Sequence, residues 1–166
     1  ISRKGKILQF EFKKNSIGFH LGMRGRLDLN GLKNKHTHGL FFFDKDVLLY
    51  DDIRKFGYIK IIKNEQANSL FAAIGPDSLS LSKKDKNYVL NKASRSSTSI
   101  KNFLLNQKNL SGLGNIYVNE ILFLAGVHPI SEAFKLKEKN WNEIFFYTKK
   151  VLQKAIKNNG TTLSDM

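Results

Sequence analysis

The sequence of 166 residues contains no cysteine. This absence excludes disulfide bonds and any thiolate metal site within these residues. Long apolar runs are also missing, since none approaches the roughly 20 residues that a membrane-spanning helix needs. The first 20 residues alternate apolar positions with lysine, glutamine and glutamate, where a secretory signal would hold an unbroken apolar block. We therefore expect a soluble protein that binds no membrane.

Acidic residues are scarce beside basic ones. Lysine and arginine total 28 against 14 aspartates and glutamates, which gives a formal net charge of +14. A field of this size attracts polyanions. An AT-rich genome, whose codons favour Lys, Asn, Ile and Phe, is the simpler cause. The clustering argues against it, because six basic residues and only one acid, Asp85, lie in the stretch from Lys83 to Lys101. The charge therefore favours a nucleic-acid partner.

Residues 1–63 have the pattern of β-strands. Leu8, Phe10 and Phe12 alternate with polar residues, as in a half-buried strand. Short apolar runs follow at 18–21, 39–43, 47–50 and 58–62, and residues 44–46 have the composition of a hairpin turn. A sheet this small with so many phenylalanines is too apolar to stand uncovered, so we expect another layer to pack on it, and we expect that this chain starts too late to supply that layer.

The rest of the chain reads as a connection followed by helices. Residues 64–82 contain a Gly-Pro-Asp-Ser turn signal. From residue 83 onward we expect a helix beginning near Ser97–Ser99, another between Asn115 and Gly126, and a third from Trp141 to Asn158 with an Asn140–Glu143 capping box. The predicted fold class is α+β, with domains at 1–63 and 83–166 joined by 64–82.

Histidines and glycines supply the first functional candidates. His36 and His38 lie two residues apart without a cysteine or carboxylate set, so we expect no metal site, and either could donate to a phosphate. Gly112 and Gly114 lie between two predicted helices, where glycine lets the backbone approach a ligand and the next helix can offer amides to an anion. A tight helix–helix turn is the alternative, but Lys101 and Asn115 nearby favour an anion.

At this point the residues resemble a known family. Residues 113–120, Leu-Gly-Asn-Ile-Tyr-Val-Asn-Glu, are similar to the helix–two-turns–helix signature of the formamidopyrimidine-DNA glycosylase and endonuclease VIII family. Further similarities follow in order and spacing at Arg3–Lys6, His20–Met23, Asp52–Gly57, Ile100–Lys101, Gly126–Pro129 and Gly160–Leu163. The resemblance implies a partial N-terminal β-sandwich followed by a helix–two-turns–helix domain, with DNA between them.

The resemblance also implies phosphate contacts. Lys6 matches the family lysine beside the damaged nucleotide, and His36 falls where the family has a phosphate-contacting histidine. Lys101 and Asn115 match the residues by which the helix–two-turns–helix motif holds the DNA backbone.

Three further residues match the side chains that fill the gap left by an everted base. These are Met23, Arg54, which would face the orphaned cytosine, and Phe56, which would wedge into the base stack. Ordinary core packing is the alternative for Met23 and Phe56, although the charged neighbours of Phe56 make a core position less natural.

The implied activity is base excision. A family member removes oxidised purines, 8-oxoguanine and formamidopyrimidines, from double-stranded DNA and cleaves at abasic sites, and we expect a monomer in the bacterial cytoplasm. The alternatives are the endonuclease VIII branch acting on oxidised pyrimidines, a non-catalytic nucleic-acid-binding paralogue, or a basic protein without a nucleic-acid role.

One departure from the family concerns catalysis. Family members begin with Pro-Glu, whose proline attacks the sugar, whereas this sequence begins Ile1-Ser2-Arg3. We therefore expect a partial chain, inactive by itself and without catalytic residues, in preference to a paralogue that has lost catalysis. The zinc ion of the family would belong to a four-cysteine finger outside these residues, so we expect no cofactor here.

Overall fold

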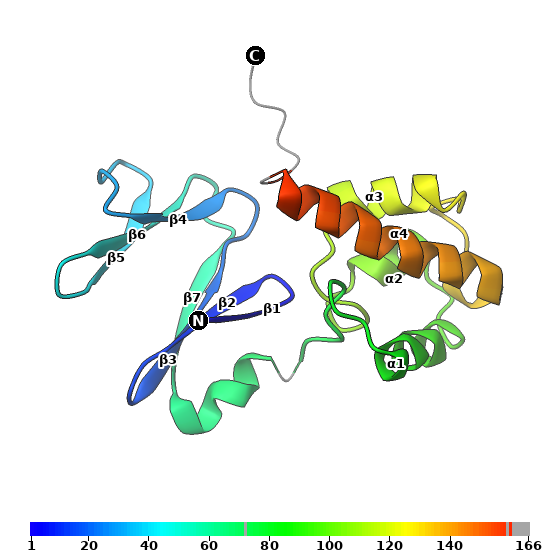
Figure 1. The fold of residues 1–166 in the computed structure, drawn as a ribbon, viewed down its shortest axis with the longest axis horizontal. Helices are drawn as coiled ribbons and strands as arrows, with labels where there is room; N and C mark the ends of the chain where they lie inside the picture. Colours follow the sequence, from blue (N-terminus) through cyan, green and yellow to red (C-terminus); the bar gives the residue numbers. More distant parts are fainter. Residues whose placement is uncertain (72, 159, 161–166) are drawn as a thin grey trace, which may run out of the picture. The chain divides into compact units, whose positions relative to one another are not determined.

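The computed structural model describes residues 1–71, 73–158 and 160. The chain divides into two compact units, Ile1–Ala72 and Ala73–Met166. The first is built of strands and the second of helices, which confirms the predicted α+β class (Figure 1). Thr161–Leu163 of the predicted motif lie outside the described residues. The predicted domain boundaries at 63/64 and 82/83 stay a prediction.

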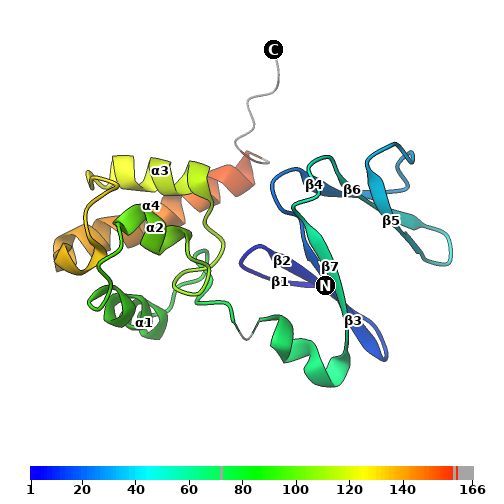
Figure 2. The ribbon, with the colours of Figure 1, turned by 180° about the vertical axis from the view of Figure 1, so that it is seen from behind.

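The sheet unit contains two antiparallel sheets (Figures 1 and 2). One has four strands in the order β1-β2-β3-β7, and the other has three in the order β4-β6-β5. The bounds are β1 Ser2–Lys4, β2 Ile7–Glu11, β3 Asn15–His20, β4 Gly25–Leu29, β5 Thr37–Phe42, β6 Val47–Asp52 and β7 Tyr58–Lys63. A 3-10 helix, η1 (Asn64–Leu70), follows β7.

Phe19 lies at the centre of the sheet unit and is only 1% exposed. Its ring lies 5.2 Å from that of Phe10 and, across to the other sheet, 5.1 Å from that of Phe41 and 6.3 Å from that of Tyr50. A second sheet of the same chain therefore covers part of the apolar face, which corrects the expectation that the chain does not supply this cover. Phe42 remains 75% exposed.

The alternation in β2 predicts the strand correctly but the burial of one residue wrongly. Gln9, expected on the polar side, is 7% exposed. Its amide nitrogen donates to the Ser16 hydroxyl at 3.1 Å, and that hydroxyl in turn donates to Asn64 Oδ1 at 3.0 Å. A buried amide is tolerated when such partners satisfy it.

Among its described residues, the helical unit contains the three expected helices and one more, α1, that the sequence patterns did not predict. Its helices are α1 (Lys83–Ala93), α2 (Ile100–Leu105), α3 (Asn115–Leu124) and α4 (Glu138–Lys157), with a 3-10 helix η2 (Ala133–Lys135). Ser82 forms a capping box with Asp85, and Ser99 accepts from the Asn102 amide at 3.3 Å. The start of α4 differs from the prediction. The N-cap is Lys137, whose amide donates to Asn140 Oδ1 at 3.1 Å, so the helix begins three residues before Trp141.

A continuous core holds the helices together, and α3 packs along α4 (Figures 1 and 2). Ile100, Leu104, Val118, Ile121 and Ile144 are all 0% exposed. The segment that precedes α1 is fixed to the loop after α2, because the Ser111 hydroxyl donates to the Gly75 and Pro76 carbonyls. This core positions both ends of the loop between α2 and α3.

Candidate nucleic-acid interface

The connection between β6 and β7 carries two of the predicted gap-filling residues. It runs from Ile53 to Gly57, and within it Lys55 has a positive φ of 55°. The Asp52 carboxylate lies beneath it at 1% exposure. Its Oδ1 accepts from the Arg54 amide at 3.1 Å, and its Oδ2 accepts from the Gly57 amide at 2.8 Å.

These contacts also set the ionisation of Asp52. The Gly57 amide, with further donors around the turn, holds the pKa of the Asp52 carboxyl below its ordinary value, although burial acts in the opposite direction. Tyr50 adds its hydroxyl, which donates to Oδ2 at 3.3 Å. The turn is therefore organised around a buried carboxylate.

The structure brings Met23, Arg54 and Phe56 together. The Arg54 guanidinium carbon lies 4.7 Å from the centre of the Phe56 ring, and Arg54 Nη1 lies 3.5 Å from the Met23 sulfur. Met23 is 68% exposed and Phe56 is 55% exposed. Core packing, the alternative reading for these two side chains, does not describe their positions. We call these three residues the gap-filling trio.

Gly22 lets the loop that bears Met23 approach the Phe56 turn. Its φ is +60°, and a Cβ added there would lie 2.7 Å from the backbone of both Phe56 and Gly57. A side chain would push the two loops apart. The trio thus depends on a close backbone approach as well as on side-chain contacts.

Lys6 lies directly before β2, and His20 ends β3 in the neighbouring position across the sheet. The His20 ring stacks on Tyr58 at 5.1 Å and 3°. Its Nδ1 accepts from the Gly22 amide at 3.2 Å, which leaves the hydrogen of the neutral ring on Nε2. Burial first, and then the Lys6 charge, lower the pKa of His20, while burial lowers the pKa of Lys6.

His20 lies in one of the motifs that resemble the family, but it was not among the predicted site residues. Its closeness to Lys6 follows from the pairing of Ile7 with His20 between β2 and β3. Strand register of this kind is set by the folded sheet, so the only signal available beforehand was the family resemblance.

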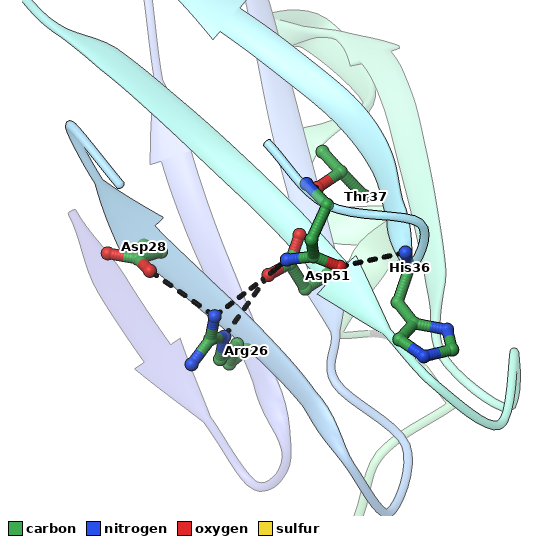
Figure 3. A network of polar contacts seen from close by, with 6 residues as sticks. Arg26, Asp28, His36, Thr37 and Asp51 are labelled. Atoms are coloured by element: carbon green, nitrogen blue, oxygen red, sulfur yellow. Dashed lines mark hydrogen bonds and ion pairs between the residues drawn. The ribbon is translucent and has the colours of Figure 1, made fainter. Parts of the chain in front are cut away.

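His36 lies beside a polar network that ties β4 to β6 (Figure 3). Its amide donates to Asn34 Oδ1 at 2.8 Å, and its carbonyl accepts from the Asp52 amide at 3.0 Å. Figure 3 shows its imidazole pointing away from Asp51. The structure therefore fixes the backbone of His36 next to Asp52 and leaves its phosphate role a prediction.

Asp51 forms the centre of that network. Arg26 donates to its Oδ2 from Nε at 3.2 Å and from Nη2 at 3.0 Å, and Asn34 donates at 2.8 Å. The Thr37 side chain, followed by Asn34 and Arg26, holds the pKa of the Asp51 carboxyl below its ordinary value, while burial opposes this shift. Asp51 and Asp52 are thus adjacent buried carboxylates with separate sets of partners.

In the helical unit, Lys101 and Asn115 lie near the starts of α2 and α3. Lys101 is the second residue of α2, and its amide donates to the Pro129 carbonyl at 3.2 Å. Asn115 is the exposed first residue of α3, preceded by Gly114 as an N-cap without a side-chain hydrogen bond. The first amides of a helix lack partners within it, so this end can donate to an anion.

A single side chain closes the loop between these two helices. Gln107 Nε2 donates to the carbonyls of Leu105 at 2.9 Å and Leu113 at 3.0 Å, and Oε1 accepts from the Gly112 amide at 2.9 Å. Gly112 has a φ of +100°, which favours glycine. The sequence pattern of Gly112 and Gly114 indicates either a tight turn between helices or part of an anion site. The two interpretations are compatible, because the turn is tight and no side chain caps the first amides of α3.

Comparisons with known proteins account for both units. Residues 1–59 match the model of the formamidopyrimidine-DNA glycosylase N-terminal domain, and residues 74–166 match that of the formamidopyrimidine-DNA glycosylase H2TH domain. The chain belongs to the formamidopyrimidine-DNA glycosylase family.

Relatives in this family are similar along the whole chain. The formamidopyrimidine-DNA glycosylase of Psychromonas ingrahamii is 37% identical over 169 residues, which cover 99% of this chain and 62% of that protein. A complex between Lactococcus lactis Fpg and DNA containing an abasic site superimposes with a TM-score of 0.88 at 35% identity, covering 99% of this chain and 63% of that one. A structure of MutM with DNA containing carbocyclic 8-oxo-G has the same TM-score and identity, covering 98% and 63%. The chain thus spans less than two thirds of these relatives.

The residues present do not fit the four-cysteine zinc finger that the resemblance implies for the family. A four-cysteine site needs thiolates, and the sequence has none. Within the described part of the chain, no three His, Cys, Asp or Glu side chains gather as a metal site requires. Within these described residues, no helix is both long and apolar enough to cross a bilayer.

Proposed function

We propose that the protein is a DNA glycosylase of base-excision repair. It removes oxidised purines, 8-oxoguanine and formamidopyrimidines, from double-stranded DNA and cleaves the strand at the resulting abasic site. The observation that carries this proposal is the gap-filling trio, three exposed side chains of the expected types in which Arg54 contacts both Met23 and Phe56. The names of the relatives support the purine-directed branch over the endonuclease VIII branch.

The trio suits a duplex from which one base has been everted. Eversion leaves a hole and costs a few kcal/mol of unstacking and unpairing. The planar Phe56 ring can enter the stack as an apolar wedge. The Arg54 guanidinium offers several N–H donors to the base that has lost its partner, and the Met23 thioether adapts to the remaining gap.

Phosphate contacts would hold the duplex in register. On the sheet unit these come from Lys6, with His20 Nε2 as a neighbouring donor, and from His36. On the helical unit they come from Lys101, Asn115 and the uncapped amides of α3. Such contacts position a protein on DNA without reading its sequence.

The gap-filling trio and the phosphate-contacting residues bind the DNA, orient it and help to evert the damaged base. The family resemblance implies that a proline followed by a glutamate breaks the bonds. This sequence has no such pair, because Pro76 is followed by Asp77 and Pro129 by Ile130. We place the protein in the bacterial cytoplasm, acting as a monomer on damaged DNA.

A second candidate is a non-catalytic nucleic-acid-binding protein. The net charge of +14 favours it, because phosphate contacts need no lesion. A glycosylase acts only on damaged DNA, whereas the non-catalytic protein would bind damaged and undamaged DNA alike.

The test measures single-turnover excision by the protein as its gene encodes it, with Phe56→Ala as the variant. The substrates are a duplex with 8-oxoguanine opposite cytosine, the same duplex with an abasic site, and the undamaged duplex. We expect Phe56→Ala to keep the melting temperature and to slow excision of the paired lesion about 10- to 100-fold, as loss of roughly 1.4–2.8 kcal/mol of eversion energy requires. Cleavage at the abasic site should change less, because no base is expelled.

Phe42→Ala is the matched control, because Phe42 is even more exposed but lies outside the trio. It should leave both reactions unchanged. A Phe56→Ala protein that unfolds, or that excises at the wild-type rate, contradicts the wedge. A wild type that excises nothing and binds damaged and undamaged DNA alike supports the second candidate.

A further inference from the structure

The turn that carries Arg54 and Phe56 receives no support from a strand ladder between its two ends. β6 belongs to the three-stranded sheet and pairs with β4 and β5, whereas β7 belongs to the four-stranded sheet and pairs with β3. Residues 53–57 therefore cross from one sheet to the other. A loop of this kind needs other contacts to hold one conformation.

Asp52 supplies those contacts from the end of β6. Each of its two carboxylate oxygens accepts one amide of the turn, Oδ1 from Arg54 at 3.1 Å and Oδ2 from Gly57 at 2.8 Å. Asp52 is itself fixed, because its amide donates to His36 and its carbonyl lies 3.0 Å from His38 Nε2. The two amides that it binds flank Phe56.

The backbone within the turn has a conformation that must be enforced. Lys55 has φ at 55°, a left-handed region that costs a non-glycine residue about 1–2 kcal/mol. Gly57 is enclosed as well, since an added Cβ would meet the Tyr50 hydroxyl at 2.1 Å and the His20 carbonyl at 2.5 Å. Hydrogen bonds to an ionised carboxylate are strong enough to offset such strain.

We propose that Asp52 is a positioning residue for base eversion, whose carboxylate sets the conformation of Arg54 and Phe56 before DNA arrives. The side chains that enter the stack are then already ordered, and binding does not have to supply that ordering. This inference rests on the proposed function and adds to it a residue that touches neither the DNA base nor the reacting sugar.

Asp52→Asn is the test variant, and the chain offers Asp51→Asn as its control. Asparagine keeps the shape of aspartate but turns one acceptor into a donor, which faces an amide N–H that also donates. Asp51 is the preceding residue on β6, is 4% exposed, and accepts side-chain hydrogen bonds from Arg26 and Asn34. Both variants remove one buried charge from the same strand, but only Asp52→Asn removes an acceptor from the turn.

The first measurement is amide hydrogen exchange in the free protein. We expect the Arg54 and Gly57 amides to exchange at least about tenfold faster in Asp52→Asn and to be unchanged in Asp51→Asn. Tyr50→Phe, which removes only the hydroxyl that donates to Asp52, should accelerate the same amides to a smaller extent. If Asp52→Asn does not fold, unchanged exchange in Tyr50→Phe overturns the inference.

The second measurement is single-turnover excision in a double-mutant cycle with Phe56→Ala. Asp52→Asn should slow excision of a paired 8-oxoguanine as much as Phe56→Ala does, about 10-fold or more, and the double variant should be no slower. Cleavage of a preformed abasic site and binding to undamaged duplex should stay near wild type. If Asp52 only stabilises the fold, the rate losses of the two single variants should multiply in the double variant, and excision and abasic-site cleavage should slow equally. Either result overturns the inference.

Different results overturn the proposed glycosylase function and the positioning role of Asp52. A wild-type protein that excises no oxidised purine overturns the proposed function, and the eversion role falls with it. A wild type that excises normally, together with Asp52→Asn that exchanges faster but everts as well as wild type, overturns only the positioning role. The exchange measurement needs neither DNA nor activity, so it tests the contact by itself.

Discussion

The two units bury their apolar residues to different extents. In the helical unit, Val89, Ile100, Leu104, Leu113 and Val118 are all 0% exposed. In the sheet unit Phe19 is 1% exposed, but the buried residues Ile7, Leu48 and Ile62 keep 6%, 7% and 8%. The helical unit is therefore held by a closed core, and the sheet unit depends more on polar contacts such as those of Asp51 and Asp52.

The difference extends to how each unit presents its candidate site. The helical unit offers backbone amides and two polar side chains at helix starts, which packing alone can position. The sheet unit offers three side chains on loops, held by a buried carboxylate and a close glycine contact. Contacts to phosphates can be made by groups at helix starts. Side chains that enter a base stack need a fixed conformation, which the buried carboxylate and the glycine contact can supply.

The largest expected effect tests the closed core. Leu104→Ala should lower the free energy of unfolding of the helical unit by about 2–5 kcal/mol, because it leaves a cavity among fully buried side chains. Phe42→Ala in the sheet unit should change stability by less than about 0.5 kcal/mol. Urea unfolding is followed by Trp141 fluorescence for the helical unit, since Trp141 is the only tryptophan, and by hydrogen exchange of the β6 amides for the sheet unit. Similar losses in the two variants would remove the contrast.

Acid should separate the units next. The folded-state pKa values of Asp51 and Asp52 are lowered, so their stabilisation is present above the ordinary aspartate pKa near 3.9 and is lost as pH falls through the lower folded values. We expect β6 amides to lose exchange protection at a higher pH than Trp141 changes its fluorescence. Simultaneous transitions would contradict this.

The smallest effect concerns salt. Lys101→Ala should weaken binding to every duplex alike and reduce the slope of log affinity against log salt by about 1, the share of one phosphate contact. Lys149→Ala, an exposed lysine on α4, removes the same charge away from the motif and should leave the slope nearly unchanged. Equal slopes for the two variants would show that Lys101 acts only through net charge.

Local patterns predicted much of the architecture. Alternation located β2, and Ser99 and Asn115 marked the starts of α2 and α3, because these features depend on neighbours along the chain. The start of α4 was missed, because Lys137 is an unusual N-cap and the signal at Asn140 belongs to its third residue. Gln9 was placed on the wrong side, because a hydroxyl on another strand decides its burial.

The residues of the candidate site also divide into those that the sequence predicts and those that only the folded structure reveals. The gap-filling trio, Lys6, Lys101 and Asn115 could be predicted as site residues because the resemblance names residue types at fixed spacings. Asp52 and His20 could not, because their importance lies in a carboxylate beneath a turn and in strand register. Neither leaves a periodic or compositional signal.

The Gln107 amide has a consequence for how the helical unit responds to its surroundings. It joins α2, the loop and α3 through three hydrogen bonds in which neither partner carries a charge. Mobile ions screen charges but act little on such short neutral contacts. Raising the ionic strength should therefore weaken the attraction between this loop and a polyanion while leaving the shape that the polyanion meets the same.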